Sequence, residues 1–359
     1  MSDEIKKQET RDNVYIDMPV EVPSLSLDGE KKNMRRAFSR CGWAVFIATL
    51  SGFVLALGLG EIAANVEWLG NFVYNVNLYM YVNEVIIAIT FMLGALALIG
   101  MPKKKPERKP VKVKSFIAMF CICASIGAIG NVIGNIILTV WNFITGGNAE
   151  NPLTEMLMSV NPMSMIICVA ILAPVLEEFF FRKLLIDRMY PYGERTAILV
   201  SAIAFGLFHQ NFSQFFYAFG IGLVLGYLYC KTGSYKAVTL LHMAFNFIFG
   251  VIPSILSKDV LTFAEEMETI AGSNTDALVS LMIRYALPLS LYFIYLLVSG
   301  AFDIAGIVLF CMNAKKIKVE KSESALPVED RVLAVTVNVG VILALVLLIF
   351  LTVLSLFSL

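Results

Sequence analysis

Two adjacent glutamates and an arginine lie inside a strongly apolar stretch of the sequence: Glu177, Glu178 and Arg182. Three phenylalanines separate Glu178 from Arg182, which argues against a merely charged boundary of the apolar run. Ionisable groups inside hydrocarbon are costly and therefore indicate a functional site. Glu178 and Arg182 have the spacing of an ion pair on one helix face. Glu177 lies about 100° around such a helix. We therefore predict one structural carboxylate, held by Arg182, and one that is free to act as a general base.

The chain contains only two histidines, His209 and His242, and both lie within apolar runs. Asn246 follows His242 by one helical turn and shares its face. A single buried histidine is more often a packing residue, but two with no others elsewhere indicate a joint role. Histidine can transfer protons or bind a metal ion at neutral pH. Counted from the nearest turns at about 1.5 Å per residue, these three residues and Glu177 lie within about 10 Å of one another in depth. This layer is the predicted active site.

The elements that position these residues are membrane spans. Of 359 residues, 58% are hydrophobic and 16% charged, and the mean hydropathy is +0.76. The 28 basic and 28 acidic residues balance, so the chain has no net positive charge that would attract a nucleic acid. This composition excludes a soluble enzyme, a disordered protein and a nucleic-acid binder. The six cysteines have no metal-ligand spacing and are expected to be buried apolar residues rather than disulfide partners. No cleavable signal peptide is expected.

The predicted fold is an all-α, polytopic transmembrane helix bundle with about eight to nine spans. Nine apolar runs are found, at 41–62, 79–101, 115–143, 162–189, 195–211, 213–230, 235–254, 285–312 and 332–358. The runs 195–211 and 213–230 could form a tight hairpin or one broken segment. The predicted organisation is a polar cytoplasmic tail (1–40), N-terminal spans (41–143), a catalytic core (160–254), an acidic external loop (255–283) and C-terminal spans (284–359).

Basic residues predict the orientation. With the N-terminus inside, 26 of the 28 Lys and Arg residues fall on cytoplasmic segments, and only Lys258 and Arg284 lie outside. These segments are 1–40, 102–114, 182–195, 231–236 and 313–331. We read the clusters chiefly as topology signals, with contact to anionic lipids as a secondary role. The N-terminus and the basic loop 102–114 are therefore expected to be cytoplasmic, in what we expect to be a bacterial plasma membrane.

Three motifs in order resemble those of the CPBP intramembrane proteases: Glu-Glu-x-x-x-Arg at 177–182, Phe-x-x-x-His at 205–209 and His-x-x-x-Asn at 242–246. The family includes the type II CAAX prenyl endopeptidases and bacterial bacteriocin-processing or immunity (Abi-like) proteins. Each motif alone is weak, but the three together on consistently oriented spans are specific. The resemblance covers about residues 160–250 and implies hydrolysis of a peptide bond within or near the membrane.

The resemblance also implies roles for the matching residues. Glu177 and His209 would activate a water, His242 and Asn246 would stabilise the oxyanion, and Glu178 and Arg182 would support them. A metalloprotease account of the family instead makes Glu177, His209 and His242 candidate ligands of a metal such as Zn²⁺. No His-Glu-x-x-His helix is present. The residues permit both accounts; no cofactor is firmly implied, and we expect metal-free hydrolysis.

The predicted function is an intramembrane endopeptidase that acts on a membrane-associated peptide or protein of CAAX-like or leader type. The expected partners are this substrate and the lipid bilayer, and the oligomeric state is left open. A non-proteolytic immunity or sensor protein of the same fold is the alternative. A transporter is a weaker one, since the titratable cluster occupies one layer and no inverted repeat is evident. Glu84 and Asp303 are isolated intramembrane acids to which the sequence assigns no role.

Overall fold

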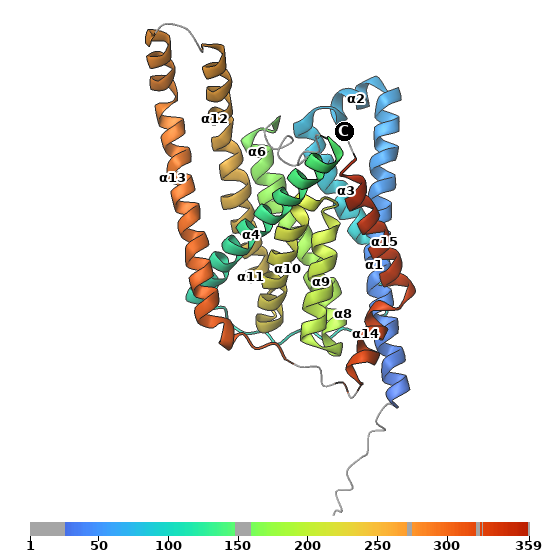
Figure 1. Ribbon diagram of the computed structural model, residues 1–359. Helices are drawn as coiled ribbons and strands as arrows, with labels where there is room; N and C mark the ends of the chain where they lie inside the picture. The colour runs from blue at the N-terminus through green and yellow to red at the C-terminus, as the bar shows by residue number, and fades with distance from the viewer. Residues whose placement is uncertain (1–25, 148–158, 271–274, 321–323, 325, 358–359) are drawn as a thin grey trace, which may run out of the picture.

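The computed structural model describes residues 26–147, 159–270, 275–320, 324 and 326–357, and these residues form helices without any strand. Figure 1 shows most of the long helices running along one direction, with α4 crossing them obliquely. The N-terminal half of the bundle contains α1 (Leu27–Asn65), α2 (Glu67–Val73), α3 (Val76–Leu96) and α4 (Val113–Thr145). The span that carries the glutamates is a chain of short segments: α6 (Pro162–Met165), η2 (Ile166–Leu172), α7 (Ala173–Glu178), η3 (Phe179–Ile186), α8 (Asp187–Met189) and η4 (Tyr190–Tyr192).

The remaining helices complete the core and its C-terminal flank. They are α9 (Glu194–Phe208), α10 (Phe212–Thr232), α11 (Tyr235–Asn246), η5 (Phe247–Val251), α12 (Ile252–Thr269), α13 (Thr275–Asn313), η6 (Ala314–Lys316), α14 (Val328–Thr336) and α15 (Val339–Leu354). Helix α10 packs along both α4 and α9, and α1 packs against α3 and α15. Helices α12 and α13 pair with each other and extend beyond the rest of the bundle (Figure 1).

Among the described residues, seven helices are long and apolar enough to cross a membrane, or eight if the bent pair α14–α15 is one span. The predicted multi-pass all-α bundle is thus confirmed, but the nine full-length spans are not all present. The missing one is the run 195–211, which forms the 15-residue helix α9. At about 1.5 Å per residue, α9 is about 22 Å long, short of the roughly 30 Å of a hydrocarbon core.

Polar residues end α9 early and turn the chain back into α10. Gln210 has a φ of 56°, an uncommon backbone conformation for a residue other than glycine. The side chain of Asn211 accepts hydrogen bonds from Ser213 Oγ and from the backbone N–H of Gln214, both 2.8 Å long, and so caps α10. The two runs therefore form a tight hairpin, one of the two arrangements that the sequence left open.

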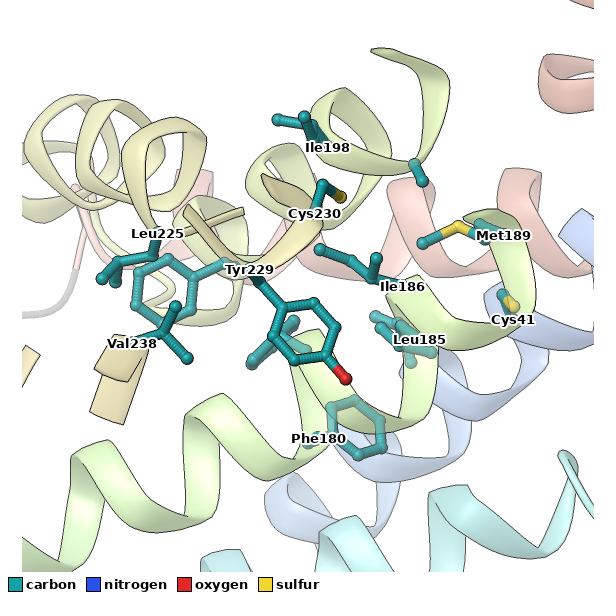
Figure 2. Packing of buried hydrophobic residues seen from close by; sticks show 14 of the residues in the cluster. Cys41, Phe180, Leu185, Ile186, Met189, Ile198, Leu225, Tyr229, Cys230 and Val238 are labelled. Carbon is teal, nitrogen blue, oxygen red and sulfur yellow. The ribbon is translucent and has the colours of Figure 1, made fainter. Parts of the chain in front are cut away.

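Glycines on α4 permit close packing against α10. A Cβ atom at Gly130 of α4 would lie 2.5 Å from the backbone of Tyr217 on α10, so only glycine fits this crossing. The core continues toward one end of the bundle, where apolar side chains from α1, η3, α8, α9, α10 and α11 interlock (Figure 2). In the same region Tyr229 donates a 2.8 Å hydrogen bond from its hydroxyl to Oδ1 of Asp187. This packing joins the core helices to α1.

The five basic segments meet at one end of the bundle. Backbone hydrogen bonds of 2.8 Å join Lys104 to Asp187 and Lys109 to Thr232. Further hydrogen bonds join Arg40 to the carbonyls of Ala97 and Ile99, and the backbone N–H of Glu320 to the carboxylate of Glu194. Ion pairs join Lys31 to Asp330 and Lys231 to Glu194. The described parts of the five basic segments are therefore neighbours in space, as one membrane face requires. The cytoplasmic identity of that face stays a prediction.

Two segments that were expected to be a loop and a polar tail contain helix in their described parts. The proposed acidic loop 255–283 holds most of α12 and the beginning of α13, and residues 271–274 lie outside the described part. The proposed polar tail 1–40 is helical from Leu27, where Ser26 caps α1 by accepting a hydrogen bond from the backbone N–H of Gly29. Residues 1–25 lie outside the described part. All six cysteines are unpaired, and five are buried, whereas Cys311 is exposed.

Candidate active site

The two glutamates lie on α7, an α-helical segment of six residues between two stretches of π-helix, η2 and η3. A third π-helical stretch, η5, directly follows Asn246 at the end of α11. π-Helical turns are rare and frequently occur at functional sites, because the inserted residue re-aims the side chains around it. The three π-helical stretches adjoin the helices that carry the glutamates of the first motif and the His-x-x-x-Asn of the third motif. The amino-acid sequence offered no signal for them.

Glu178 is held on both of its carboxylate oxygens. Its Oε2 lies 3.0 Å from Nε of Arg182, in an ion pair that is not aligned as a hydrogen bond. Its Oε1 accepts a 3.0 Å hydrogen bond from Nδ1 of His242 on α11. The side chains of Glu178 and Arg182 are both fully buried. The predicted ion pair between these two residues is therefore confirmed, and His242 is a second partner that the sequence did not reveal.

Glu177 faces the other side of the same imidazole. Its Oε2 lies 3.7 Å from Nε2 of His242, which is too long for a hydrogen bond. Its side chain is 14% exposed, whereas that of Glu178 is fully buried. The two adjacent glutamates thus differ in environment, as predicted. They do not diverge completely, however, because His242 contacts one and faces the other.

The ring of Phe205, on α9, joins the charged cluster to the second histidine. Cζ of Arg182 lies 4.6 Å from the ring centroid, a cation–π contact. The imidazoles of His209 and His242 meet the same ring edge-on, at centroid distances of 5.1 and 5.7 Å. A Cβ at Gly222 of α10 would lie only 3.1 Å from this ring. The close crossing of α9 and α10 therefore helps to position Phe205.

His209 lies directly after the last residue of α9, where the helix stops. Its Nδ1 is 2.9 Å from the backbone carbonyl of Phe205. A carbonyl can only accept, so Nδ1 carries the hydrogen in this contact, and Nε2 of the neutral ring keeps a lone pair. That nitrogen is available to accept a proton or to bind a metal ion.

Asn246 is anchored by the span that carries the glutamates. Its Nδ2 donates a 2.9 Å hydrogen bond to the backbone carbonyl of Val169 in η2. This bond uses one N–H of the side-chain amide and fixes the plane of the amide, which leaves the second N–H for another acceptor. Asn246 is therefore tied to the site-bearing span one helical turn beyond His242.

The structure adds two residues that sequence reasoning did not place in the site. The ring of Tyr217 lies 6.4 Å from that of His209, and its hydroxyl donates a 3.0 Å hydrogen bond to Oε1 of Gln214. Glu84 is buried on α3, which packs against η2, α7 and η3, and interacts electrostatically with Glu177. Its Oε2 has no hydrogen-bond partner among the described residues. An acid in an apolar run was the signal for Glu84, but only tertiary packing shows what it faces.

The residues present do not form a ready-made metal centre. Across the described ranges, no group of three or more His, Cys, Asp or Glu side chains is arranged to hold a metal ion. Glu178 occupies Nδ1 of His242, and the ring of Phe205 contacts both imidazoles. The candidate set Glu177, His209 and His242 thus does not fit a preformed ligand shell, and we derive no chemical step through a metal.

The fold and the site define a multi-pass membrane protein with a buried acid–histidine cluster inside the bundle. Residues 159–248 match the family described as type II CAAX prenyl endopeptidase Rce1-like. This match covers about a quarter of the chain and supports a relationship of its core to the CPBP family of membrane-embedded CAAX proteases. At the level of that family, it supports an intramembrane endopeptidase.

Individual relatives agree with this assignment. The chain is similar to the membrane-embedded CAAX protease MroQ of Staphylococcus aureus (strain USA300), with 28% identity over 191 residues. The matched region covers 50% of this chain and 76% of that protein. YdiL of Bacillus subtilis (strain 168), named as a membrane peptidase, is 29% identical over 109 residues, which cover 29% of this chain and 42% of that protein. No solved structure matches the chain significantly.

Proposed function

We propose that this protein hydrolyses a peptide bond of a membrane-associated substrate, of CAAX-like or leader type, with Glu177 as the general base. The observation that carries the proposal is the position of His242 between the two glutamates. Its Nδ1 is bound to Glu178 at 3.0 Å, and its Nε2 faces Glu177 at 3.7 Å. Both relatives come from bacteria, and we propose the bacterial plasma membrane as the location.

The two glutamates have different proposed roles, one catalytic and one positioning, because their partners differ. Glu178 has one oxygen on His242 and the other on Arg182, so it orients the imidazole and has no free oxygen for a substrate. Among the described residues, Glu177 has no carboxylate oxygen in a close ion pair: it approaches His242 at 3.7 Å, and its side chain is 14% exposed. A carboxylate with an available lone pair in a dry site can take a proton from water. Glu177 is therefore the proposed base, and Glu178 a positioning residue.

In the proposed reaction, a water oxygen attacks the scissile carbonyl carbon while its proton passes to Glu177. The lone pair on Nε2 of His209 offers a second acceptor that orients this water. The carbonyl oxygen becomes an oxyanion, which the second N–H of Asn246 and a proton on Nε2 of His242 stabilise. Glu177 then returns its proton to the leaving amine, and the C–N bond breaks.

The test is cleavage of synthetic peptides by the purified protein in lipid nanodiscs, read by mass spectrometry. One set carries a prenylated CAAX-type C-terminus, and the other consists of unprenylated leader-type sequences. Glu177→Gln keeps the shape but removes the base, so turnover should fall by orders of magnitude with folding unchanged. His209→Ala should be comparably severe, and the double variant scarcely worse than either single one. Asp303→Asn, a distant intramembrane acid on α13, is the matched control and should cleave normally.

Three results of the peptide-cleavage assay would contradict parts of this proposal. Cleavage by Glu177→Gln at the parent rate would end the proposal that Glu177 is the base. Activity that a chelator abolishes and Zn²⁺ restores would replace this mechanism with a metal-dependent one. If the unaltered protein cleaves neither peptide set, the non-proteolytic immunity or sensor alternative takes its place.

A further inference from the structure

A cavity of about 600 Å³ lies at the basic end of the bundle, between the segment that leads into α4 and the first turns of α11. Its polar lining includes three cations, Arg108, Lys109 and Lys236. Ser234 also lines it and caps α11 by accepting a hydrogen bond from the backbone N–H of Ala237. The N-terminus of this 12-residue helix adds a partial positive charge beside the cations. The polar half of the cavity therefore suits an anion.

The wall that carries two of these cations is built into the fold. The backbone N–H of Lys109 donates a 2.8 Å hydrogen bond to the carbonyl of Thr232, at the end of α10. Gly233 has a φ of 56°, and a Cβ there would lie 2.5 Å from the carbonyl oxygen of Pro106. Only glycine permits both this turn and this close approach. The segment around residues 106–109 is thus fixed against the α10–α11 turn.

The other half of the cavity is apolar and continues along helices that enter the membrane. Phe116 of α4 and Leu240 of α11 line it, together with Val113. Val113 is 73% exposed and Leu240 is 56% exposed, so this apolar surface faces outward. A free inorganic anion makes no use of such a surface, whereas a molecule with an acidic head and a hydrocarbon tail uses both halves.

We propose that this cavity is a binding site for a phospholipid with an anionic headgroup. The headgroup phosphate lies among Arg108, Lys109 and Lys236, and an acyl chain runs along Phe116 and Leu240. Glu107 contacts Lys109 at 3.0 Å, but both side chains are well exposed. Such an exposed ion pair contributes little and yields to a phosphate. The site stands apart from the proposed catalytic residues but shares α11 with His242, so an occupied site also anchors the N-terminus of a catalytic helix.

The experiment measures lipid retained by the full-length protein. The protein is reconstituted in nanodiscs of phosphatidylcholine mixed with phosphatidylglycerol, extracted in mild detergent, and analysed by native mass spectrometry. The triple variant Arg108→Gln, Lys109→Gln, Lys236→Gln tests the site. The control carries Lys315→Gln, Lys316→Gln and Lys318→Gln, which remove three exposed cations from the same end without touching the cavity. The three cations removed in the site variant line one cavity, so their contacts with one headgroup phosphate are lost together, and this variant should bind phosphatidylglycerol on the order of 100-fold more weakly. The control should change by no more than about threefold.

The tail half is tested separately with Leu240→Gln, which should weaken binding of phosphatidylglycerol while the three cations stay in place. Equal loss of lipid in the site and control variants, or no loss in either, would overturn the proposal, because it would show only general attraction to a basic surface. Displacement of phosphatidylglycerol by inorganic phosphate, together with no effect of Leu240→Gln, would overturn the lipid in favour of a simple anion site. Peptide cleavage by all variants reports independently on the catalytic machinery.

Discussion

Replacement of Arg182 by methionine should destabilise the protein more than any change at an exposed charge. Arg182 is fully buried, and its contacts are the carboxylate of Glu178 at 3.0 Å and the face of Phe205 at 4.6 Å. Methionine has a similar length and fills the space, so the variant tests the charge rather than the volume. The perturbation leaves Glu178 as a buried anion whose remaining hydrogen-bond partner, within the part of the chain that the structure describes, is His242.

The size of the effect follows from this geometry. Two unit charges 3.0 Å apart attract by about 5 kcal/mol at an effective dielectric constant of about 20. Because removal of one partner strands the other in a buried environment, the free energy of unfolding should fall by about 3–5 kcal/mol. Arg284→Met is the matched control, since Arg284 pairs with Glu266 at 2.9 Å but is 64% exposed. It should cost no more than about 1 kcal/mol.

Equilibrium unfolding in mixed micelles, with rising denaturing detergent, measures these differences. The double variant Glu178→Gln, Arg182→Met removes both charges and should recover at least about 2 kcal/mol relative to Arg182→Met alone. Its peptide cleavage should stay below that of the parent, because an amide holds the Nδ1–H of His242 less firmly than a carboxylate. If Arg182→Met were as stable as the parent, or the double variant no better than the single one, the ion pair would not be the stabilising contact inferred here.

Three other predictions follow from single residues. Asn246→Ala should lower kcat by about 10²–10³-fold, the loss expected for one oxyanion donor; an unchanged kcat in the nanodisc peptide assay would remove it from that role. Glu84→Met should raise the free energy of unfolding by about 1–3 kcal/mol, because it replaces a buried oxygen that lacks a partner; a lower unfolding midpoint in mixed micelles would contradict this. Lys105→Cys, in a Cys311→Ser background that leaves only buried cysteines, should react with an impermeant maleimide in opened cells but not in intact ones. Labelling of intact cells would reverse the predicted topology.

Local helical spacing accounts for the part of the site that the sequence could predict. Glu178 and Arg182 pair because residues four apart share a helix face, and this holds even though η3 begins between them. The cytoplasmic clustering of basic residues likewise predicted segments that the structure brings to one end. Both inferences depend on short-range geometry or on the direction of successive spans. Neither needs knowledge of how distant helices pack.

Long-range packing and local backbone breaks account for what the sequence could not predict. Glu84 is 93 positions before Glu177, and only the packing of α3 on α7 shows that their charges interact. The backbone of Gln210 adopts a positive φ that shortens α9, so hydropathy alone overestimated the number of full-length spans. Residues 255–283 were predicted to form a loop because they are polar, but a helix exposes polar side chains to solvent as well as a loop does. Composition could not distinguish these two conformations.

The position of one imidazole between two adjacent carboxylates changes how the site should be understood. Helical geometry suggested that Glu177 and Glu178 face different partners, which would make them independent. Instead, Nδ1 of His242 binds one and Nε2 faces the other, so any change in the protonation or orientation of the ring acts on both. In the proposed reaction, His242 is therefore more than an oxyanion donor, because it also connects the anchor Glu178 to the proposed base Glu177. The effects on turnover of substitutions at Glu177, Glu178 and His242 should consequently be far from additive, because removal of one side chain also removes the contribution of the other two.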